Sequence, residues 1–241
     1  MSIATEITRI KTAKADIKSA IEEKGVEVGE GTIDTYAEKI GEISSGGGID
    51  YLKYAKAYQF ATMEGLPEEV VVNFENATTL QNLICNFNVT NVKKLTINCQ
   101  KPITNMARMI YDGDKSFEHI TINVDTSKCG TFNQCFNRMP NLKIIDGPPL
   151  DFSSSGTNGA SMFYYSPSLE ELRIAENSIK VSIGFGHCSL LSDTTIQSII
   201  DGLADLTGGT QQTLTLHSTV GVKLTEEQKA TITAKNWELV Y

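Results

Sequence analysis

A pair of apolar residues flanking one spacer residue recurs along this chain at a nearly constant spacing. The steps between successive pairs are 25, 25, 25, 27, 42 and 25 residues. A period in the twenties is typical of stacked repeats, in which each unit supplies one strand and a returning segment. We therefore predict an α/β fold, a right-handed β-α superhelix with one parallel sheet in which all pairs are equivalent. The pairs are Val70/Val72, Leu95/Ile97, Ile120/Ile122, Ile145/Gly147, Leu172/Ile174, Leu214/Leu216 and Leu239/Tyr241.

A second apolar column precedes each predicted strand. Cys85 and Cys135 occupy one position of this column, and Ile110 and Met162 fill it in the other repeats. We therefore predict that both thiols are buried and reduced, because cysteine often serves as a small apolar residue. The chain has five cysteines, an odd number, and they are widely spaced without a CxxC pair, which argues against a disulfide framework and a zinc site.

Residues 1–43 have a helical pattern that differs from the repeats. The isoleucines of the first predicted helix lie alternately four and three residues apart, which makes a heptad seam with Ile at both core positions. Such a seam favours assemblies of three or more helices, so we expect a homo-oligomer, a trimer. The alternative is that the seam packs on a second amphipathic helix of the same chain. The seam residues are Ile3, Ile7, Ile10, Ile17 and Ile21.

These patterns divide the chain into three parts. Residues 1–43 are the helical attachment or oligomerisation module. Residues 44–48 are a Ser/Gly linker of the flexible type. Residues 49–241 form the repeat domain.

The repeat domain is expected to begin and end with caps. We assign an N-terminal cap to residues 49–69, repeats to 70–191, and C-terminal repeats with a cap to 192–241. The step of 42 residues is expected to hold an inserted helix that begins at Ser192 or Asp193. The segment Thr225-x-x-Gln228 is a capping box, which predicts a last helix before the final strand.

Two repeat units carry a family resemblance. The segments Cys135-Phe136-x-x-Met139-x-x-Leu142-x-x-Ile145 and Met162-Phe163-x-x-Ser166-x-x-Leu169-x-x-Leu172 match each other. They resemble the BspA-like leucine-rich repeat, whose units read roughly as Phe-x-x-Cys-x-x-Leu-x-x-Ile-x-Ile. The likeness covers about residues 66–241 and implies a leucine-rich-repeat solenoid. Gly147-Pro148-Pro149 and the long step depart from the family pattern.

The N-terminal segment carries a second resemblance. The stretch from Ile3 to Lys18, with the stretch from Ile33 to Ile40, is similar to the N-terminal segment of phage and prophage tail-associated proteins. This resemblance implies a structural protein attached to a virion or phage tail, with the repeats displayed outward. The alternative is a bacterial cell-surface adhesin of BspA type. The chain shows no basic region followed by an apolar one at its start, so no Sec signal is readable, which weighs against the adhesin.

The candidate chemistry argues against an enzyme. The three histidines have no G-x-S-x-G nucleophile elbow to serve, and Asp112-Gly113-Asp114 lacks the remaining ligands of a calcium loop. We therefore expect no catalytic residues, no metal and no cofactor. The net charge of −8, without a Lys/Arg run, argues against nucleic-acid binding. No apolar stretch approaches the roughly 20 residues of a membrane span, so we expect no membrane insertion.

The residues that alternate with the buried pairs are the candidate binding residues. Successive side chains of a strand point to opposite faces, so these residues are expected to tile the concave face of the sheet. We expect this polar face to bind a protein or glycan on a host cell surface, the alternative being a merely solvated sheet. Both His119 and His217 are expected at outward strand positions. The candidate residues are Lys94, Thr96, His119, Thr121, Asp146, Glu171, Arg173, Thr215 and His217.

Overall fold

The structure, a computed structural model, describes residues 3–22, 68–85, 92–111, 116–156, 159 and 161–241. The chain separates into two compact units, Met1–Ile49 and Asp50–Tyr241. The second predicted helix, the 44–48 linker and nearly all of the 49–69 cap lie outside the described residues.

The described part of the first unit is helix α1 (Ile3–Glu22). The helix confirms the helical pattern of the sequence. Ile7, Ile10 and Ile17 of the predicted seam are 49%, 52% and 38% exposed, whereas Ile21 is 3% exposed. The side chain of Ile3 lies outside the described residues.

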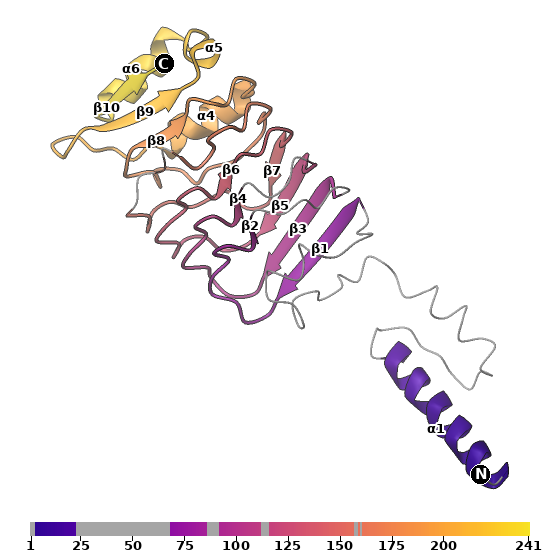
Figure 1. The fold of residues 1–241 in the computed structure, drawn as a ribbon. Coiled ribbons are helices and arrows are strands. Elements are labelled where there is room, and N and C mark those ends of the chain that lie inside the picture. Colours follow the sequence, from indigo (N-terminus) through magenta and orange to yellow (C-terminus); the bar gives the residue numbers. More distant parts are fainter. Residues whose placement is uncertain (1–2, 23–67, 86–91, 112–115, 157–158, 160) are drawn as a thin grey trace. The chain divides into compact units, whose positions relative to one another are not determined.

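A four-stranded parallel sheet begins the second unit (Figure 1). Its register pairs Val70 with Leu95, Leu95 with Ile120, and Ile120 with Ile145. The predicted equivalence of these four positions is therefore confirmed. An isolated parallel bridge between Ile144 and Glu171 continues the same register. The strands, in order across the sheet, are β1 (Glu69–Phe74), β3 (Lys94–Cys99), β5 (His119–Asn123) and β7 (Ile144–Asp146).

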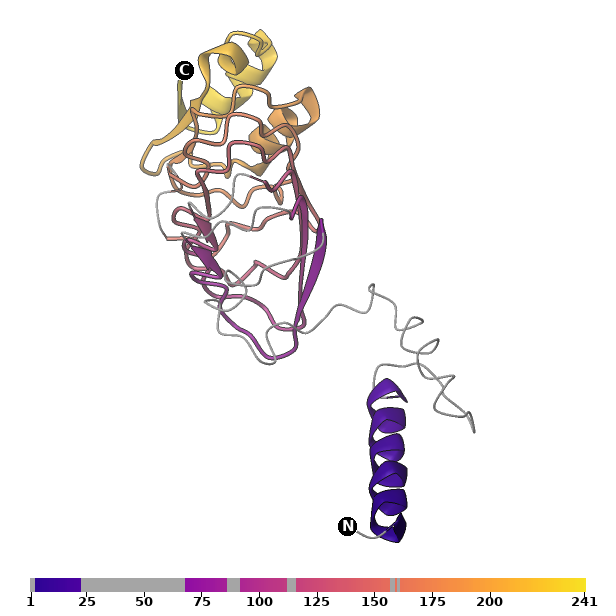
Figure 2. The same ribbon diagram turned by 45° about the vertical axis from the view of Figure 1, so that its right-hand side comes forward.

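A second parallel sheet faces the first across the core (Figure 2). Its strands alternate with those of the first sheet along the chain, so the backbone passes back and forth between the two. Apolar side chains from both sheets fill the space between them. The rings of Phe136, Phe163 and Phe185 stack in this core, with centroid separations of 5.7 and 5.0 Å. The strands are β2 (Ile84–Cys85), β4 (Ile110–Tyr111) and β6 (Phe136–Asn137).

The prediction of one continuous sheet is wrong for the C-terminal third of the chain. Leu214 pairs with Ile183 and with Leu239, and not with Leu172. These residues belong to a separate parallel sheet with the order β10-β9-β8. Its strands are β8 (Ile183–Phe185), β9 (Gln212–Leu216) and β10 (Trp237–Val240).

A helix takes the place of the next strand beside Leu172. The backbone N–H of Leu172 donates to Thr195 Oγ1 at 3.1 Å, and that of Ile174 donates to Ser198 Oγ at 2.9 Å. Both hydroxyls belong to α4 (Asp193–Gly202). Since side chains of a helix satisfy these strand donors, the first sheet ends here. The predicted helix exists, but it replaces a strand and is not an insertion.

The C-terminal helices follow their predicted caps. Ser192 caps α4 by accepting from the N–H of Thr195, and Thr225 with Gln228 forms the predicted capping box. The last two helices are α5 (Ser218–Gly221) and α6 (Glu226–Ala234). Lys235, just after α6, donates to the carbonyl of Leu203 at 2.7 Å and so ties α6 to the end of α4.

The second apolar column is shifted by one residue from its predicted register. The second sheet aligns Ile84, Ile110 and Phe136, so Ile110 is the counterpart of Phe136 and not of Cys135. The connection from the first sheet to the second lengthens by one residue per repeat: Val70 to Ile84 is 14, Leu95 to Ile110 is 15, and Ile120 to Phe136 is 16 residues. A fixed period cannot align both sheets at once.

The cysteines of the described chain are unpaired. They are Cys99, Cys129, Cys135 and Cys188. Cys135 is fully buried, as predicted, and burial raises its pKa well above the usual value. Burial also raises the pKa of Cys188 to about 12. The side chain of Cys85 lies outside the described residues.

Candidate functional site

The solvent-facing side of the first sheet, here called the outer face, holds most of the predicted binding residues. Each strand alternates buried and accessible side chains, which places Lys94 beside His119. Thr96 lies beside Thr121, and Thr121 beside Asp146. Glu171 and Arg173 continue the two rows beyond β7, so seven of the nine predicted residues share this face. They are Lys94, Thr96, His119, Thr121, Asp146, Glu171 and Arg173.

Thr215 and His217 were wrongly assigned to this face. Thr215 lies on β9, in the C-terminal sheet, beside Gly184 and Val240. His217 is not on a strand at all. It is the N-cap of α5, and its Nδ1 accepts from the N–H of Thr219 at 3.2 Å. Both errors follow from the assumption of one sheet.

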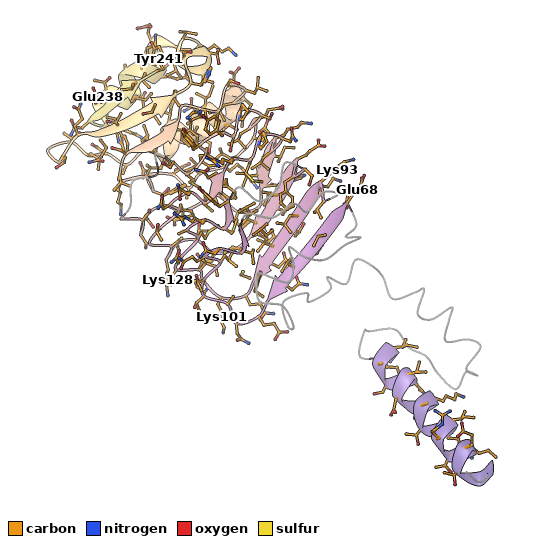
Figure 3. The ribbon with its side chains drawn as sticks, in the orientation of Figure 1. Glu68, Lys93, Lys101, Lys128, Glu238 and Tyr241 are labelled. Atoms are coloured by element: carbon orange, nitrogen blue, oxygen red, sulfur yellow. The ribbon has the colours of Figure 1, made fainter. Side chains whose placement is uncertain are left out.

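Charged residues at the start of the strands form a row of alternating sign, here called the charge ladder. Backbone hydrogen bonds link the rungs in order across the sheet. Lys93 Nζ lies 2.9 Å from Glu68 Oε1, and Lys143 Nζ lies 2.8 Å from Glu118 Oε2 (Figure 3 labels the first pair). The five rungs are Glu68, Lys93, Glu118, Lys143 and Glu170.

The ladder neutralises charge that the sequence offered for binding. Hydrogen bonding to Glu68 raises the pKa of Lys93, and hydrogen bonding to Lys143 lowers the pKa of Glu118. A lowered carboxyl pKa stabilises the fold above the pKa of the unfolded chain, and this contribution is lost as the pH falls. Lys94 makes a similar ion pair with Glu69. The predicted binding residue Lys94 thus already has an anionic partner.

Reversing the charge of the central rung tests the ladder. Glu118→Lys would place three cations side by side, because Lys93 and Lys143 flank position 118. We expect this variant to unfold at a lower temperature than the neutral control Glu118→Gln. The gap should be largest in dilute buffer and shrink at about 1 M salt, where the Debye length falls to about 3 Å. Equal melting temperatures of the two variants in dilute buffer would contradict the ladder.

An asparagine row crosses the outer face at the carboxyl ends of the strands. The Nδ2 of Asn98 donates to Oδ1 of Asn73 at 2.7 Å, and the Nδ2 of Asn123 donates to Oδ1 of Asn98 at 2.7 Å. These side-chain bonds run parallel to the backbone ladder and satisfy one amide with the next. The row ends at Asn123, where the surface is hollowed.

The hollow has a volume of about 520 Å³ and lies where β5 continues past the end of β7. Strand β7 stops at Asp146 because Gly147 turns away with φ 115° and Pro148 and Pro149 have no N–H for the ladder. The carboxyl ends of parallel strands are a usual location for ligand sites in open α/β sheets. The hollow is lined by Asn123, Val124, Asp125, Thr126, Pro148, Pro149, Asp151 and Ala175.

Two carboxylates are fixed at this hollow by backbone hydrogen bonds. Asp125 Oδ1 accepts from the N–H of Ser127 at 2.9 Å, and Asp151 Oδ1 accepts from the N–H of Ser153 at 2.8 Å. Hydrogen bonding to Ser127 lowers the pKa of Asp125. An ionised carboxylate only accepts hydrogen bonds, so it suits a ligand that carries hydroxyl or N–H donors.

The other walls of the hollow are apolar or braced. Pro148, Pro149 and Ala175 supply apolar surface. Arg173 Nη2 lies 3.4 Å from Asp146 Oδ1 and also donates to the carbonyl of Gly147. Arg173, predicted as a binding residue, therefore also holds the turn that opens the hollow. Carboxylates facing an apolar wall suit a ligand with both hydroxyls and C–H surface.

Sequence reasoning missed the polar lining of the hollow. Asn123, Asp125 and Asp151 follow the strands and do not alternate with the apolar pairs. The available signal was the Gly147-Pro148-Pro149 interruption, which removes a strand end and leaves its neighbour uncovered.

Other kinds of site are not formed by the residues described. No three His, Cys, Asp or Glu side chains in that part of the chain are placed to share a metal ion. No helix in the described ranges has the length and apolar character needed to cross a membrane. Comparisons with protein-family models, curated proteins and solved structures gave no match to this chain.

Proposed function

We propose that this chain is a non-enzymatic binding or display protein, a structural component of a phage tail or prophage particle that presents a leucine-rich-repeat surface to a host cell. The hollow at the end of the outer face is the observation that carries this proposal. It joins fixed hydrogen-bond acceptors to an apolar wall in about 520 Å³. The attachment role rests on the N-terminal resemblance and on the isoleucine seam.

The solenoid part of the proposal rests on how the chain passes between its sheets. Strands β1, β3, β5 and β7 are parallel and in sequence order, and the intervening strands β2, β4 and β6 form the facing sheet. A chain that returns to the same sheet in the same direction each time winds as a coil. Crossover connections between parallel strands are right-handed in about 98% of proteins, which supports the right-handed superhelix.

The ligand that best fits the hollow is a glycan of the host surface. Asp125 and Asp151 accept hydrogen bonds from hydroxyls, and Pro148 and Pro149 cover the C–H face of a sugar ring. Pockets of about 300–1,000 Å³ hold small ligands, so the volume suits one or two sugar rings.

Replacing the hollow's carboxylates tests the binding function. We expect the labelled full chain to bind one member of a panel of bacterial cells and surface glycans. Asp125→Asn and Asp151→Asn should weaken that binding at least tenfold, because each replaces a charged acceptor. The matched control is Asp205→Asn, since Asp205 makes the same turn with Thr207 at 2.9 Å away from the hollow.

The outcomes of this experiment separate a binding site from an inert surface. Loss of binding in the two hollow variants, with retention in Asp205→Asn, supports the proposal. Equal binding by all variants overturns the hollow as the site. Release of cleaved sugar from the bound glycan overturns the non-enzymatic part of the proposal.

The attachment role implies that the isoleucine seam meets other copies of α1. Ile10 and Ile17 are exposed on the helix, and Ile at both heptad positions favours a trimer. We expect the full chain to have the mass of a trimer by light scattering, and Ile10→Gln with Ile17→Gln to give a monomer. Ala15→Gln, an exposed position on the opposite side of α1, is the control. A parent chain that is monomeric at high concentration would remove this role.

A further inference from the structure

An exposed cluster of aromatic rings lies beside the second sheet, away from the outer face. Tyr164 and Tyr165 are 37% and 53% exposed. Their ring centroids are 4.4 Å apart, and His187 lies 4.3 Å from Tyr164 and 5.0 Å from Tyr165. Three rings thus pack on one another at the surface, although aromatic side chains gain most from burial. We call these residues, with Arg138, the ring cluster.

Arg138 joins the rings through the register of the backbone. Its N–H donates to the carbonyl of Tyr164 at 2.7 Å, which sets Arg138 beside Tyr165 in the next turn of chain. The hydrogen bond with Tyr165 raises the pKa of Tyr164, while the charge of Arg138 acts in the opposite direction. The guanidinium therefore lies within electrostatic reach of the tyrosine hydroxyl.

The backbone at this cluster is held in an uncommon conformation. Arg138 has φ 60° and Tyr165 has φ 55°, values in the left-handed region where Gly and Asn are favoured. Arg and Tyr side chains occupy both positions, at a steric cost of about 1–2 kcal/mol for each residue. Backbone strain of this kind concentrates at functional sites.

We propose that the ring cluster is a second binding site, for an acidic saccharide. The ring of Tyr165 offers apolar surface to the C–H groups of a sugar, and the Arg138 guanidinium pairs with its carboxylate through two N–H donors. The tyrosine hydroxyls and His187 add polar contacts. This site goes beyond the function proposed for the hollow and is independent of it.

Charge and size both favour an acidic saccharide over the alternatives. The chain has a net charge of −8, yet the ring cluster contains a cation and no carboxylate. A stable protein interface uses about 20–30 residues on each side, far more than these four. The rings contact one another at 4.3–5.0 Å, so they enclose no space for a quaternary ammonium group, which needs rings set apart around it.

The test is titration calorimetry of the full chain with trigalacturonate, with neutral maltotriose as the reference. We expect trigalacturonate to bind at least tenfold more tightly than maltotriose and to weaken in 0.5 M salt (about 4 Å Debye length). Tyr165→Asn and Arg138→Gln should each weaken binding at least tenfold. Asn is chosen at position 165 because it tolerates the left-handed conformation.

Two control variants keep the result specific. Arg108→Gln is matched to Arg138→Gln, because Arg108 is also exposed, has φ 51°, and lies 5.3 Å from the Tyr111 ring outside the cluster. Asp125→Asn disables the hollow alone. Both should bind trigalacturonate like the parent chain. Loss of binding in Asp125→Asn would place the saccharide in the hollow and overturn the second site.

Further outcomes would also overturn the proposal. These are no binding of trigalacturonate at about 10 mM, which corresponds to a free energy weaker than about 3 kcal/mol, and equal binding of the acidic and neutral saccharides. Tighter binding of a polyglutamate peptide, lost in the same two variants, would assign the cluster to an acidic protein partner instead. Circular dichroism of each variant confirms that it is folded.

Discussion

Gly147→Ala is expected to lower the free energy of unfolding by about 2–6 kcal/mol, through backbone strain and overpacking together. Gly147 has φ 115°, which side chains with a Cβ rarely adopt. A Cβ at this position would lie 2.2 Å from the carbonyl oxygen of Ile122. That oxygen belongs to the backbone of β5, so it cannot move without loosening the pairing of β5 with β7. Urea unfolding measures the change.

Two other glycines separate the causes of this effect. Gly208 has φ 80°, but a Cβ added there would meet no atom within 4 Å, so Gly208→Ala measures the conformational cost alone, about 1 kcal/mol. Gly156 has open space and no such φ, so Gly156→Ala should stay within about 1 kcal/mol of the parent chain. If Gly147→Ala costs no more than Gly208→Ala, the close approach to Ile122 is not present in the protein.

Leu172→Ala is expected to cost about 2–5 kcal/mol, the usual range for removing a buried leucine side chain. Leu172 is 2% exposed and lies where the first sheet meets α4. Its backbone N–H and carbonyl both bond to Thr195 Oγ1, at 3.1 and 3.4 Å, so the main chain is held in place. The surroundings therefore cannot collapse fully into the space that the side chain leaves.

The matched control for this substitution is Leu190→Ala. Leu190 is 55% exposed, so the same chemical change should alter stability by no more than about 0.5 kcal/mol. Both variants are measured by urea unfolding under identical conditions. A cost below about 1 kcal/mol for Leu172→Ala would mean that the repeat register at this position is wrong.

The first four strands were predictable because a single constraint repeats there without change. Leu95, Ile120 and Ile145 are spaced by 25 residues, and parallel pairing requires that equal spacing to hold register. The apolar pair of β9 looks the same in sequence, yet Leu214 lies in another sheet. Alternation records that a strand is half buried and does not record which sheet buries it.

The helix and the hollow were harder to predict for a related reason. Thr195 and Ser198 satisfy strand donors with hydroxyls, and short polar residues of this kind are common in helices for many other purposes. The hollow exists because β7 stops early at Gly147, so its lining is set by an absent strand. Asp125 and Asp151 become a site only when that absence is known.

The charge ladder has a period of two repeats, although the backbone has a period of one. Glu68, Lys93, Glu118, Lys143 and Glu170 alternate in sign at each step. Deleting or duplicating a single repeat would set two like charges against each other, whereas changing the number of repeats by two would keep every rung paired with its opposite. The ladder therefore makes the length of this surface change most easily in even steps, as a parity rule written in charge.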